Sequence, residues 1–409
     1  MMEKYKTYSR YKDSEDERLS YIPQSWDRKK LKFLAKIKNG QDYKSIEVDT
    51  GYPVLGSGGQ FTASSKYLYD RPSVLLGRKG TVDKPIYIDE PFWTVDTMYY
   101  TEIKNEIPEK FFYYLCLTIP FGKYITSTAL PSMTQENLSN NIFYIPINYE
   151  EKQNIANFLD YETSKMDMLI EKQQQLIKLL EEKRQAVISH AVTKGLNPNV
   201  SMKDSGVEWL GEIPEYWEIY RLKTITTLKT SKSCFKNNLI ALENIESWSG
   251  KYVKTENDYS GDGIAFKAGD ILFGKLRPYL AKVYIAESDG EAIGDFFVLR
   301  TKPKVISRFL QLCLLTQEVI FIINGSTFGA KMPRVSWEFM GNLSFVIPPL
   351  KEQEEIISYL KAEISKLDLL IEKANQTIIL LKERRTALIS AAVTGKIDVR
   401  DWQAPTITV

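Results

Sequence analysis

Histidine is nearly absent from the 409-residue chain, which contains only His190. A zinc site made of several histidines is therefore excluded. His190 lies near the end of a predicted helix, and the matching position in the second half of the chain is Ala391, which favours a surface role over a Ser-His-Asp triad. The three cysteines, Cys116, Cys234 and Cys313, form no CxxC pair. Neither a disulfide framework nor a cysteine-based zinc site is expected, and a reducing cytosol suits this composition.

The chain also lacks a strong net charge and any long apolar run. Lysine and arginine total 54 against 52 acidic residues, a formal net charge of +2. This balance excludes a globally basic, histone-like protein but leaves local basic patches open. No apolar run approaches the ~18 residues that span a bilayer, and residues 1–20 contain no signal-peptide core. We therefore expect a cytoplasmic protein of two or three domains.

What the chain does contain is an internal repeat. Residues 151–195 align without gaps with residues 352–396, and about 22 of the 40 aligned pairs from 155 to 194 are identical, where chance gives roughly two or three. Other segments of the two halves also match: KDSEDERLSYIPQSW (12–26) with KDSGVEWLGEIPEYW (203–217), LLGRKG (75–80) with LFGKLR (272–277), and LPSM…FYIP (130–146) with MPRV…FVIP (332–348). The whole chain is a tandem duplication.

The two best-matched segments predict long helices, because neither proline nor glycine interrupts residues 151–194 or 352–394 and leucines recur in heptads. Such helices pair as a coiled coil, each roughly 60 Å long at 1.5 Å per residue. Antiparallel pairing is expected because each helix follows its own globular region; a core helix of a bundle is the alternative. We place Leu169, Leu176 and Leu370 at heptad position a. The residues predicted to form the helix–helix spacer are Leu159, Met166, Leu169, Leu176, Leu180, Leu360, Leu367, Leu370, Leu381 and Leu388.

The globular regions mix strand-like runs such as PSVLLG and DILFG with turns rich in glycine and proline, and an apolar helix-like stretch recurs at 110–119 and 308–323. We predict an α+β fold in which two globular domains, each with a twisted and mostly antiparallel sheet, are separated and joined by two long antiparallel helices. The expected parts are an N-terminal segment (1–19), a first globular domain (20–149), a central helix (150–196), a linker (197–210), a second globular domain (211–350), a C-terminal helix (351–396) and a tail (397–409).

Basic side chains recur beside aromatic residues and glycines in both globular regions. Glycine lets a backbone approach a ligand closely, and interleaved cations suit phosphates and base edges. We expect lysines mainly on phosphates, and Arg78 or Arg277 at base edges; solvated surface cations are the alternative. The candidate DNA-binding residues are Ser57, Lys66, Arg71, Arg78, Lys79, Lys84, Lys123, Lys267, Lys275, Arg277, Tyr279, Lys282, Lys331 and Arg334.

Motifs that would indicate catalysis fail in detail. Residues 269–275 fit GxxxxGK, but Leu276 stands where a hydroxyl must bind magnesium. No NPPY-like or DPPY-like tetrapeptide and no FxGxG loop occurs, so the chain is not itself an amino-methyltransferase. Asp89, Glu102 and Lys104 could form a loose nuclease pattern, for which a solvated surface is the simpler explanation. We expect no catalytic residue and no metal site in this chain.

The motifs KDSGVEWLGEIPEYW, LLGRKGTVDKPIY, IPPLKEQEEIISYL and ERRTALISAAVTGKID resemble the specificity subunit of type I restriction-modification systems. The resemblance covers nearly all of the chain and includes the order of globular region and helix, repeated twice. The first copy departs from the pattern at Arg18, where the second copy has Trp209.

The resemblance implies that each globular region is a target recognition domain that reads one half of a split DNA site, while the paired helices fix the distance between half-sites. It also implies two methylation subunits that carry S-adenosylmethionine and the adenine chemistry, and restriction subunits that use ATP and magnesium. A duplicated chain has pseudo-two-fold symmetry, as a DNA duplex has, so two domains on a rigid spacer suit segments about one helical turn (~34 Å) apart.

The chief alternative is a non-DNA coiled-coil scaffold that carries two protein-binding domains. It accounts for the helices and the repeat. It does not account for the clusters of cations, aromatic residues and glycines in both halves.

Overall fold

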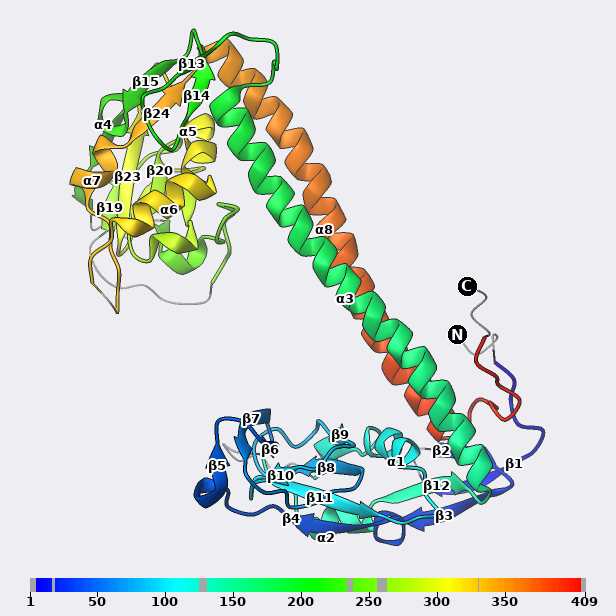
Figure 1. The fold of residues 1–409 in the computed structure, drawn as a ribbon. Helices are drawn as coiled ribbons and strands as arrows, with labels where there is room; N and C mark the ends of the chain where they lie inside the picture. The colour runs from blue at the N-terminus through cyan, green and yellow to red at the C-terminus, as the bar shows by residue number, and fades with distance from the viewer. Residues whose placement is uncertain are drawn as a thin grey trace. The chain divides into compact units, whose positions relative to one another are not determined.

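The computed structural model describes residues 5–16, 19–124, 131–233, 238–255, 263–329 and 331–405. Cys234 and Arg18 lie outside these ranges. The chain divides into two compact units, one formed by Met1–Gln173 with Gln376–Val409 and the other by Gln174–Asn375. Each unit holds one globular domain and part of both long helices (Figure 1). The tandem α+β repeat predicted from the sequence is thereby confirmed.

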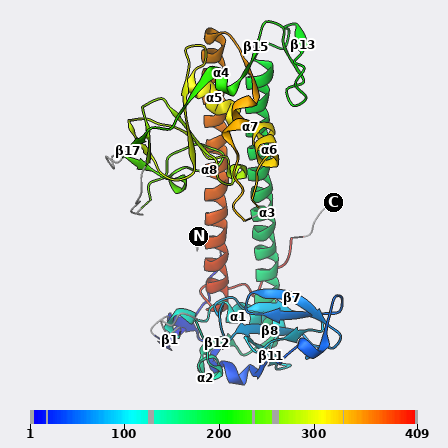
Figure 2. The ribbon, with the colours of Figure 1, turned by 90° about the vertical axis from the view of Figure 1, so that its left-hand side faces the viewer.

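The long helices are α3 (Tyr149–Lys194) and α8 (Leu350–Val393). Asn148 caps the first of them, because its side-chain oxygen accepts a hydrogen bond from the Glu150 amide at 2.8 Å. Within each unit the beginning of one helix packs against the end of the other, so the pairing is antiparallel (Figures 1 and 2). Ion pairs join the two helices in both units: Arg385 with Asp167 at 3.1 Å in the first and Arg184 with Asp368 at 3.8 Å in the second.

The seam between the helices differs from the predicted one at heptad position a. Leu169, Leu176 and Leu370 are 47%, 43% and 48% exposed, so their assignment to the seam is wrong. The reason is the heptad itself: position a follows d by four residues, whereas these leucines follow it by three and occupy position g. The true a positions include Thr163, Ile170, Ile177, Ile364, Ile371 and Ile378, all buried or half-buried.

The other predicted spacer residues lie at position d. Most of them are buried, and Leu381 is half-buried. The d residues named in the prediction are Leu159, Met166, Leu180, Leu360, Leu367, Leu381 and Leu388.

The first globular domain is built on two four-stranded sheets rather than the single sheet expected. One has the antiparallel order β4-β11-β8-β9, and the other has the order β10-β6-β7-β5 with β10 parallel to β6. The strands are β4 (Ala35–Asn39), β5 (Glu47–Val48), β6 (Tyr52–Gly56), β7 (Gly59–Ser64), β8 (Ser73–Gly77), β9 (Ile86–Ile88), β10 (Trp93–Thr94) and β11 (Met98–Ile103). Strand pairs β1 (Tyr11–Asp16) with β2 (Leu19–Pro23) and β3 (Trp26–Lys30) with β12 (Ile142–Pro146), and helices α1 (Glu109–Cys116) and α2 (Gln135–Asn140), complete the domain.

The second globular domain repeats this plan. Its sheets have the orders β16-β23-β20-β21 and β17-β19-β22-β18, again with one parallel pair, β18 with β22. The strands are β16 (Thr226–Lys229), β17 (Lys232–Ser233), β18 (Leu239–Ile240), β19 (Gly263–Phe266), β20 (Ile271–Gly274), β21 (Val283–Ile285), β22 (Gly290–Ala292) and β23 (Phe296–Thr301). The remaining elements are β13 (Met202–Asp204), β14 (Glu212–Pro214), β15 (Glu218–Arg221), β24 (Ser344–Ile347), α4 (Leu222–Ile225), α5 (Ser307–Leu314), α6 (Gln317–Gly325) and α7 (Trp337–Asn342).

The central sheet of each domain is buried on both faces, which explains the continuous apolar runs PSVLLG and DILFG. Successive side chains of a strand point to opposite faces. In β8, Val74 and Leu76 join the main core while Leu75 joins a separate core shared with the second sheet. In β20, Phe273 and Leu272 divide between two cores in the same way. A second sheet is needed because one face would otherwise expose these side chains.

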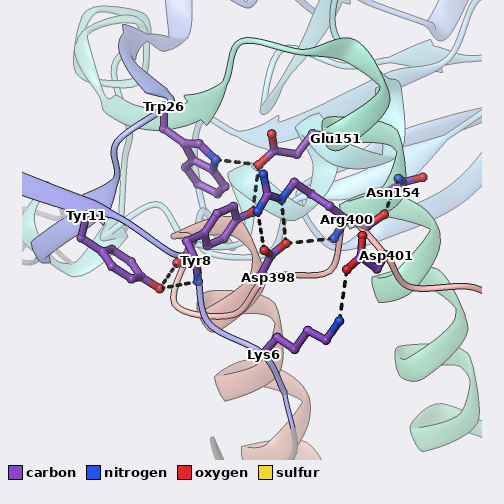
Figure 3. Close-up of polar contacts among 10 residues, drawn as sticks. Lys6, Tyr8, Tyr11, Trp26, Glu151, Asn154, Asp398, Arg400 and Asp401 are labelled. Carbon is purple, nitrogen blue, oxygen red and sulfur yellow. Dashed lines mark hydrogen bonds and ion pairs between the residues drawn. The ribbon is translucent and has the colours of Figure 1, made fainter.

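Each domain is joined to its own long helix by a buried tryptophan. Trp26 is fully buried, and its ring N–H donates to the Glu151 carboxylate at 2.9 Å (Figure 3). Trp217 is also fully buried and donates to Glu352 at 3.0 Å. Both tryptophans therefore anchor their domain to the helix that follows it. Each carboxylate lies in the first turn of its helix, where negative charge is favoured.

The corrected seam can be tested with two leucines on one helical stretch. Leu180 is 9% exposed at position d, whereas Leu176 is exposed at position g. We expect Leu180→Asp to lower the free energy of unfolding by about 3 kcal/mol or more, since it buries an unpaired charge. Leu176→Asp should change it by about 0.5 kcal/mol or less. Denaturant unfolding of both variants measures this, and equal losses would place Leu176 in the seam.

Candidate nucleic-acid interface

In each globular domain, a basic loop that follows a central strand is held by backbone hydrogen bonds to a distant segment. The loop after β8 pairs with residues 131–133: the Gly80 amide donates to Pro131 O at 2.9 Å and the Met133 amide donates to Arg78 O at 2.9 Å. The segment LLGRKG and residues 131–133, matched separately in the sequence, are therefore neighbours in the fold.

The same arrangement recurs after β20. The Arg277 amide donates to Pro333 O at 2.8 Å, and the Val335 amide donates to Lys275 O at 3.1 Å. Short helices follow both distant segments and begin with hydroxyl caps, Thr134 for α2 and Ser336 for α7. The duplication therefore extends to single hydrogen bonds of the loop.

These hydrogen bonds show which residues of the two loops are counterparts. Arg78, not Lys79, is the counterpart of Lys275, because their amides donate to the matching carbonyls of Thr97 and Asp295, both at 2.8 Å. Both cations also lie over an aromatic ring of the adjacent strand, at 6.0 Å from the Tyr99 centroid for Arg78 and at 5.7 Å from the Phe297 centroid for Lys275. Such contacts hold a cation in place without neutralising it.

Arg277 occupies the position of Gly80 in the first domain. Both residues have positive φ, 50° for Arg277 and 83° for Gly80. Glycine adopts this conformation without strain, whereas a side chain at positive φ is uncommon and costs free energy. The loop thus holds an exposed arginine in a backbone conformation that the surrounding hydrogen bonds impose. Strained residues of this kind cluster at functional sites.

Asp295 is the acidic member of the second loop, and sequence reasoning missed it. Its carboxylate accepts a hydrogen bond from the Arg334 guanidinium at 2.9 Å, which raises the pKa of Arg334. The same carboxylate lies 3.7 Å from the Lys275 ammonium. In the second domain, two of the predicted DNA-binding cations, Lys275 and Arg334, are therefore paired with a carboxylate. At the corresponding position the first domain has a threonine instead, Thr97. The aligned loops could have revealed Asp295, had carboxylates been sought at a basic interface.

Several other predicted residues lie at the same loops. Ser57 is adjacent to the first loop, since a Cβ built on Gly80 would approach its Oγ to 2.9 Å. Tyr279 and Lys331 are exposed beside the second loop, and Lys79 and Lys84 are exposed in the first.

Lys282 is turned to the protein instead of solvent. Its ammonium donates to Leu242 O at 2.7 Å, and burial lowers its pKa. A backbone-bound, half-buried ammonium is poorly placed for phosphate, so the structure argues against a DNA contact at this residue.

The structure does not bring the remaining predicted residues to the loops. Arg71 and Lys267 precede β8 and β20, so each lies at the opposite end of its strand from the loop. Strand β7 begins beside the turn that contains Ser57, and Lys66 follows the other end of this strand. Lys123 is exposed at the end of a short 3-10 helix, Phe121–Lys123. The sequence identified basic residues but could not tell which strand end each one occupies.

The described residues give no support to a metal-dependent site. Within the described ranges, no group of three or more histidine, cysteine or acidic side chains is placed to hold a metal ion. Glu102 of the weak nuclease pattern pairs with Lys38 at 3.5 Å. Residues 269–275 form a turn and strand β20, not a phosphate-binding loop before a helix. Among these residues, too, no helix is long and apolar enough to cross a membrane.

Comparison with known proteins gives one consistent family. The family model described as type I restriction modification DNA specificity domain matches the chain twice, at residues 23–179 and 214–379. The EcoDI specificity subunit of Escherichia coli is 23% identical, over 94% of this chain and 91% of the relative. The MjaVIII specificity subunit of Methanocaldococcus jannaschii is also 23% identical, over 93% of this chain and 95% of the relative.

Solved structures show the same fold. A chain from a study of complex assembly and conformational transition in a type I restriction-modification system superposes with a TM-score of 0.69 at 14% identity, over 92% of this chain and 99% of that chain. The HsdS subunit of Thermoanaerobacter tengcongensis gives a TM-score of 0.50 at 13% identity, over 92% and 98% of the two chains.

The unequal charge of the two loops yields a prediction for Asp295. Asp295→Thr introduces the residue that the first domain has at this position, so the fold should tolerate it. Arg334, which donates hydrogen bonds to this carboxylate, then becomes available to phosphates, and Lys275 loses a neighbouring negative charge. We expect about two- to fivefold tighter binding of random-sequence duplex, with about one more counterion released. The measurement is a salt titration of duplex affinity.

The converse change, Thr97→Asp, is the matched control and should weaken binding. Unchanged or weaker binding by a folded Asp295→Thr variant would remove this carboxylate from the interface.

Proposed function

The chain belongs to the type I restriction-modification DNA specificity family and is a specificity subunit, and from this premise we propose a role for each of its parts. Each globular domain reads one half of a bipartite DNA target through the loop after β8 or β20. The paired helices set the spacing between the half-sites and dock the methylation subunits. The subunit acts on double-stranded DNA in the cytoplasm.

One observation supports this proposal above the others: the duplicated loop keeps its backbone hydrogen bonds and changes its side chains. Arg78 and Gly80 in one domain stand where Lys275 and Arg277 stand in the other. Backbone geometry presents a side chain to DNA, while the identity of the side chain decides which base it reads. A scaffold with two protein-binding domains gives no reason for cations at this position in both copies.

The helices offer a face for partner subunits. Heptad positions c and g lie beside d, on the same side of both helices in an antiparallel pair. In the first unit this face exposes Leu169 and Leu380, and in the second unit it exposes Leu176, Leu179 and Leu370. Apolar side chains exposed along one face mark a protein interface. We assign this face to the methylation subunits.

Catalysis is proposed to reside in the partner subunits and not in this chain. Two methylation subunits would bind S-adenosylmethionine and methylate adenine, and restriction subunits, where present, would use ATP and magnesium. The chain itself needs no cofactor for this role, because recognition requires only positioned hydrogen-bonding groups and cations.

Domain exchange is the experiment that tests the proposed function. We expect replacement of residues 20–149 by the corresponding domain of a relative to change one half of the methylated target and leave the other half and the spacing unchanged. The reason is that each loop lies within one unit. Methylation-site mapping by the assembled complex measures the outcome. A change in both halves would contradict independent reading.

Single substitutions separate positioning contacts from base readout in the second loop. Lys275→Ala should weaken binding evenly across sequences and reduce the salt slope by about 1. Arg277→Ala should cost roughly 1–3 kcal/mol at one base pair and relax discrimination there. Affinity of the assembled complex for matched and single-mismatch duplexes measures both effects.

Lys267→Ala, at the far end of β20, serves as the control and should behave as the unmodified chain. If the two loop variants also behave as the unmodified chain, the loop does not contact DNA.

A further inference from the structure

The two units differ at one aromatic position of their long helices. Phe158 in α3 and Tyr359 in α8 are counterparts at the repeat shift of 201. Phe158 is 1% exposed, whereas Tyr359 is 42% exposed. Because the helices are otherwise matched, something covers the ring in the first unit that is missing from the second.

Aromatic side chains from both ends of the chain cover Phe158. Tyr5 packs edge-on against it, and so does Trp402, each with a centroid separation of 5.5 Å. The two terminal segments are joined to each other there: the Asp398 amide donates to Lys6 O at 2.8 Å, and Lys6 pairs with Asp401 at 3.2 Å (Figure 3). The first unit therefore fills this position with its own termini.

The second unit has no such aromatic residues. Residues 196–207 correspond to residues 5–16 at the shift of 191 that relates 203–217 to 12–26. At this shift Tyr5, Tyr8 and Tyr11 of the first copy are replaced by Leu196, Asn199 and Met202. At the helix shift of 201, which relates the segments after the two helices, Ser201 stands at the position of Trp402.

A groove of about 420 Å³ remains at this place in the second unit, lined among others by Lys183, Val187, His190, Leu196 and Tyr359. It corresponds to the position of Tyr5. Lys183 is the counterpart of Arg384 at the shift of 201. Arg384 lies beside Tyr5: burial raises the pKa of Tyr5, and the positive charge of Arg384 partly opposes this rise. Leu196 is itself 39% exposed, so the residue that replaces Tyr5 does not close the groove.

The groove continues the face assigned to partner subunits. Lys183 and His190 occupy heptad position g, as Leu176 does, and Tyr359 occupies position c on α8. Residues at positions c and g of an antiparallel pair lie on one side of it. A partner that covers Leu176 therefore reaches the groove along the same side of the helices.

We infer that this groove receives a tyrosine or tryptophan side chain from an extended segment of a methylation subunit. This side chain covers Tyr359 in the second unit, as Tyr5 covers Phe158 in the first. The inference rests on the proposed function. The ring packs against Tyr359 and Val187, as Tyr5 packs against Phe158, and a hydroxyl or ring N–H lies near Lys183 and His190. An aromatic side chain in a closed pocket is the usual centre of a protein interface.

Two variants of the complete chain test this inference against the methylation subunit of the same system. Leu196→Tyr introduces the residue of the first unit and fills the groove from within, and Tyr359→Ala removes the ring that the partner contacts. We expect each to weaken association with the methylation subunit about tenfold or more. Phe321→Ala removes an exposed aromatic side chain of the same unit outside the groove and is the control. Isothermal titration measures the affinities, and thermal unfolding shows that each variant is folded.

The single histidine gives a second, local measurement. His190 is exposed in the groove and is the only imidazole of the chain, so its modification by diethylpyrocarbonate reports on this place alone. We expect the methylation subunit to slow this modification in the unmodified chain and in Phe321→Ala.

The outcomes separate the groove from the wider proposal. Unchanged affinity in both groove variants, with His190 still reactive in the complex, overturns the inference and leaves the proposed function standing. Self-association of the chain that Leu196→Tyr abolishes also overturns it, because a second copy is then the occupant. Failure of the unmodified chain to bind the methylation subunit overturns both.

Discussion

A carboxylate in the first turn of each long helix, buried in the first unit and half-buried in the second, fixes the globular domain to that helix. Glu151 and Glu352 accept hydrogen bonds from the ring N–H groups of Trp26 and Trp217 at 2.9 and 3.0 Å. An unpaired carboxylate in such a place would be costly, so the tryptophan cannot move away without exposing or orphaning the charge. The basic loop of each unit is therefore carried by a domain that this carboxylate fastens to the helix, with a further hydrogen bond from the Tyr8 hydroxyl in the first unit and from the Tyr216 hydroxyl in the second.

The internal repeat made most of the fold predictable. Two heptad segments without proline or glycine before their last two residues indicated two paired helices, and the helix bounds at 149–194 and 350–393 lie within three residues of the matched segments. The seam was harder to predict, because leucines at d and at g look alike in a sequence. Leu176 and Leu180 have the same chemistry, but only Leu180 is buried. A helix that pairs with one neighbour and offers another face to a partner carries more apolar positions than its seam needs.

The candidate site was predictable as a pair of segments and not as a set of side chains. The motifs around Arg78 and Lys275 could be aligned in the sequence. In the structure the first lies beside residues 131–133 and the second beside residues 333–335. Residues such as Arg71 and Lys267 had the right charge, but their positions at the far ends of strands depend on strand register. Asp295 was not predicted, because the search for DNA-binding residues considered cations and not carboxylates. A carboxylate beside such cations pairs with some of them and so decides which remain available to DNA.

The two copies together show how such a domain changes the side chains of its loop without changing its fold. At the loop apex, the left-handed backbone conformation is filled by Gly80 in one domain and by Arg277 in the other. Glycine would satisfy the backbone alone, so the arginine is tolerated because the hydrogen bonds to Pro333 O and from the Val335 amide hold the loop whatever side chain it bears. The main chain thus fixes the geometry and leaves the side chain free to vary. Substitution within the loop is then possible without a change of fold, and the two halves of one chain can diverge independently.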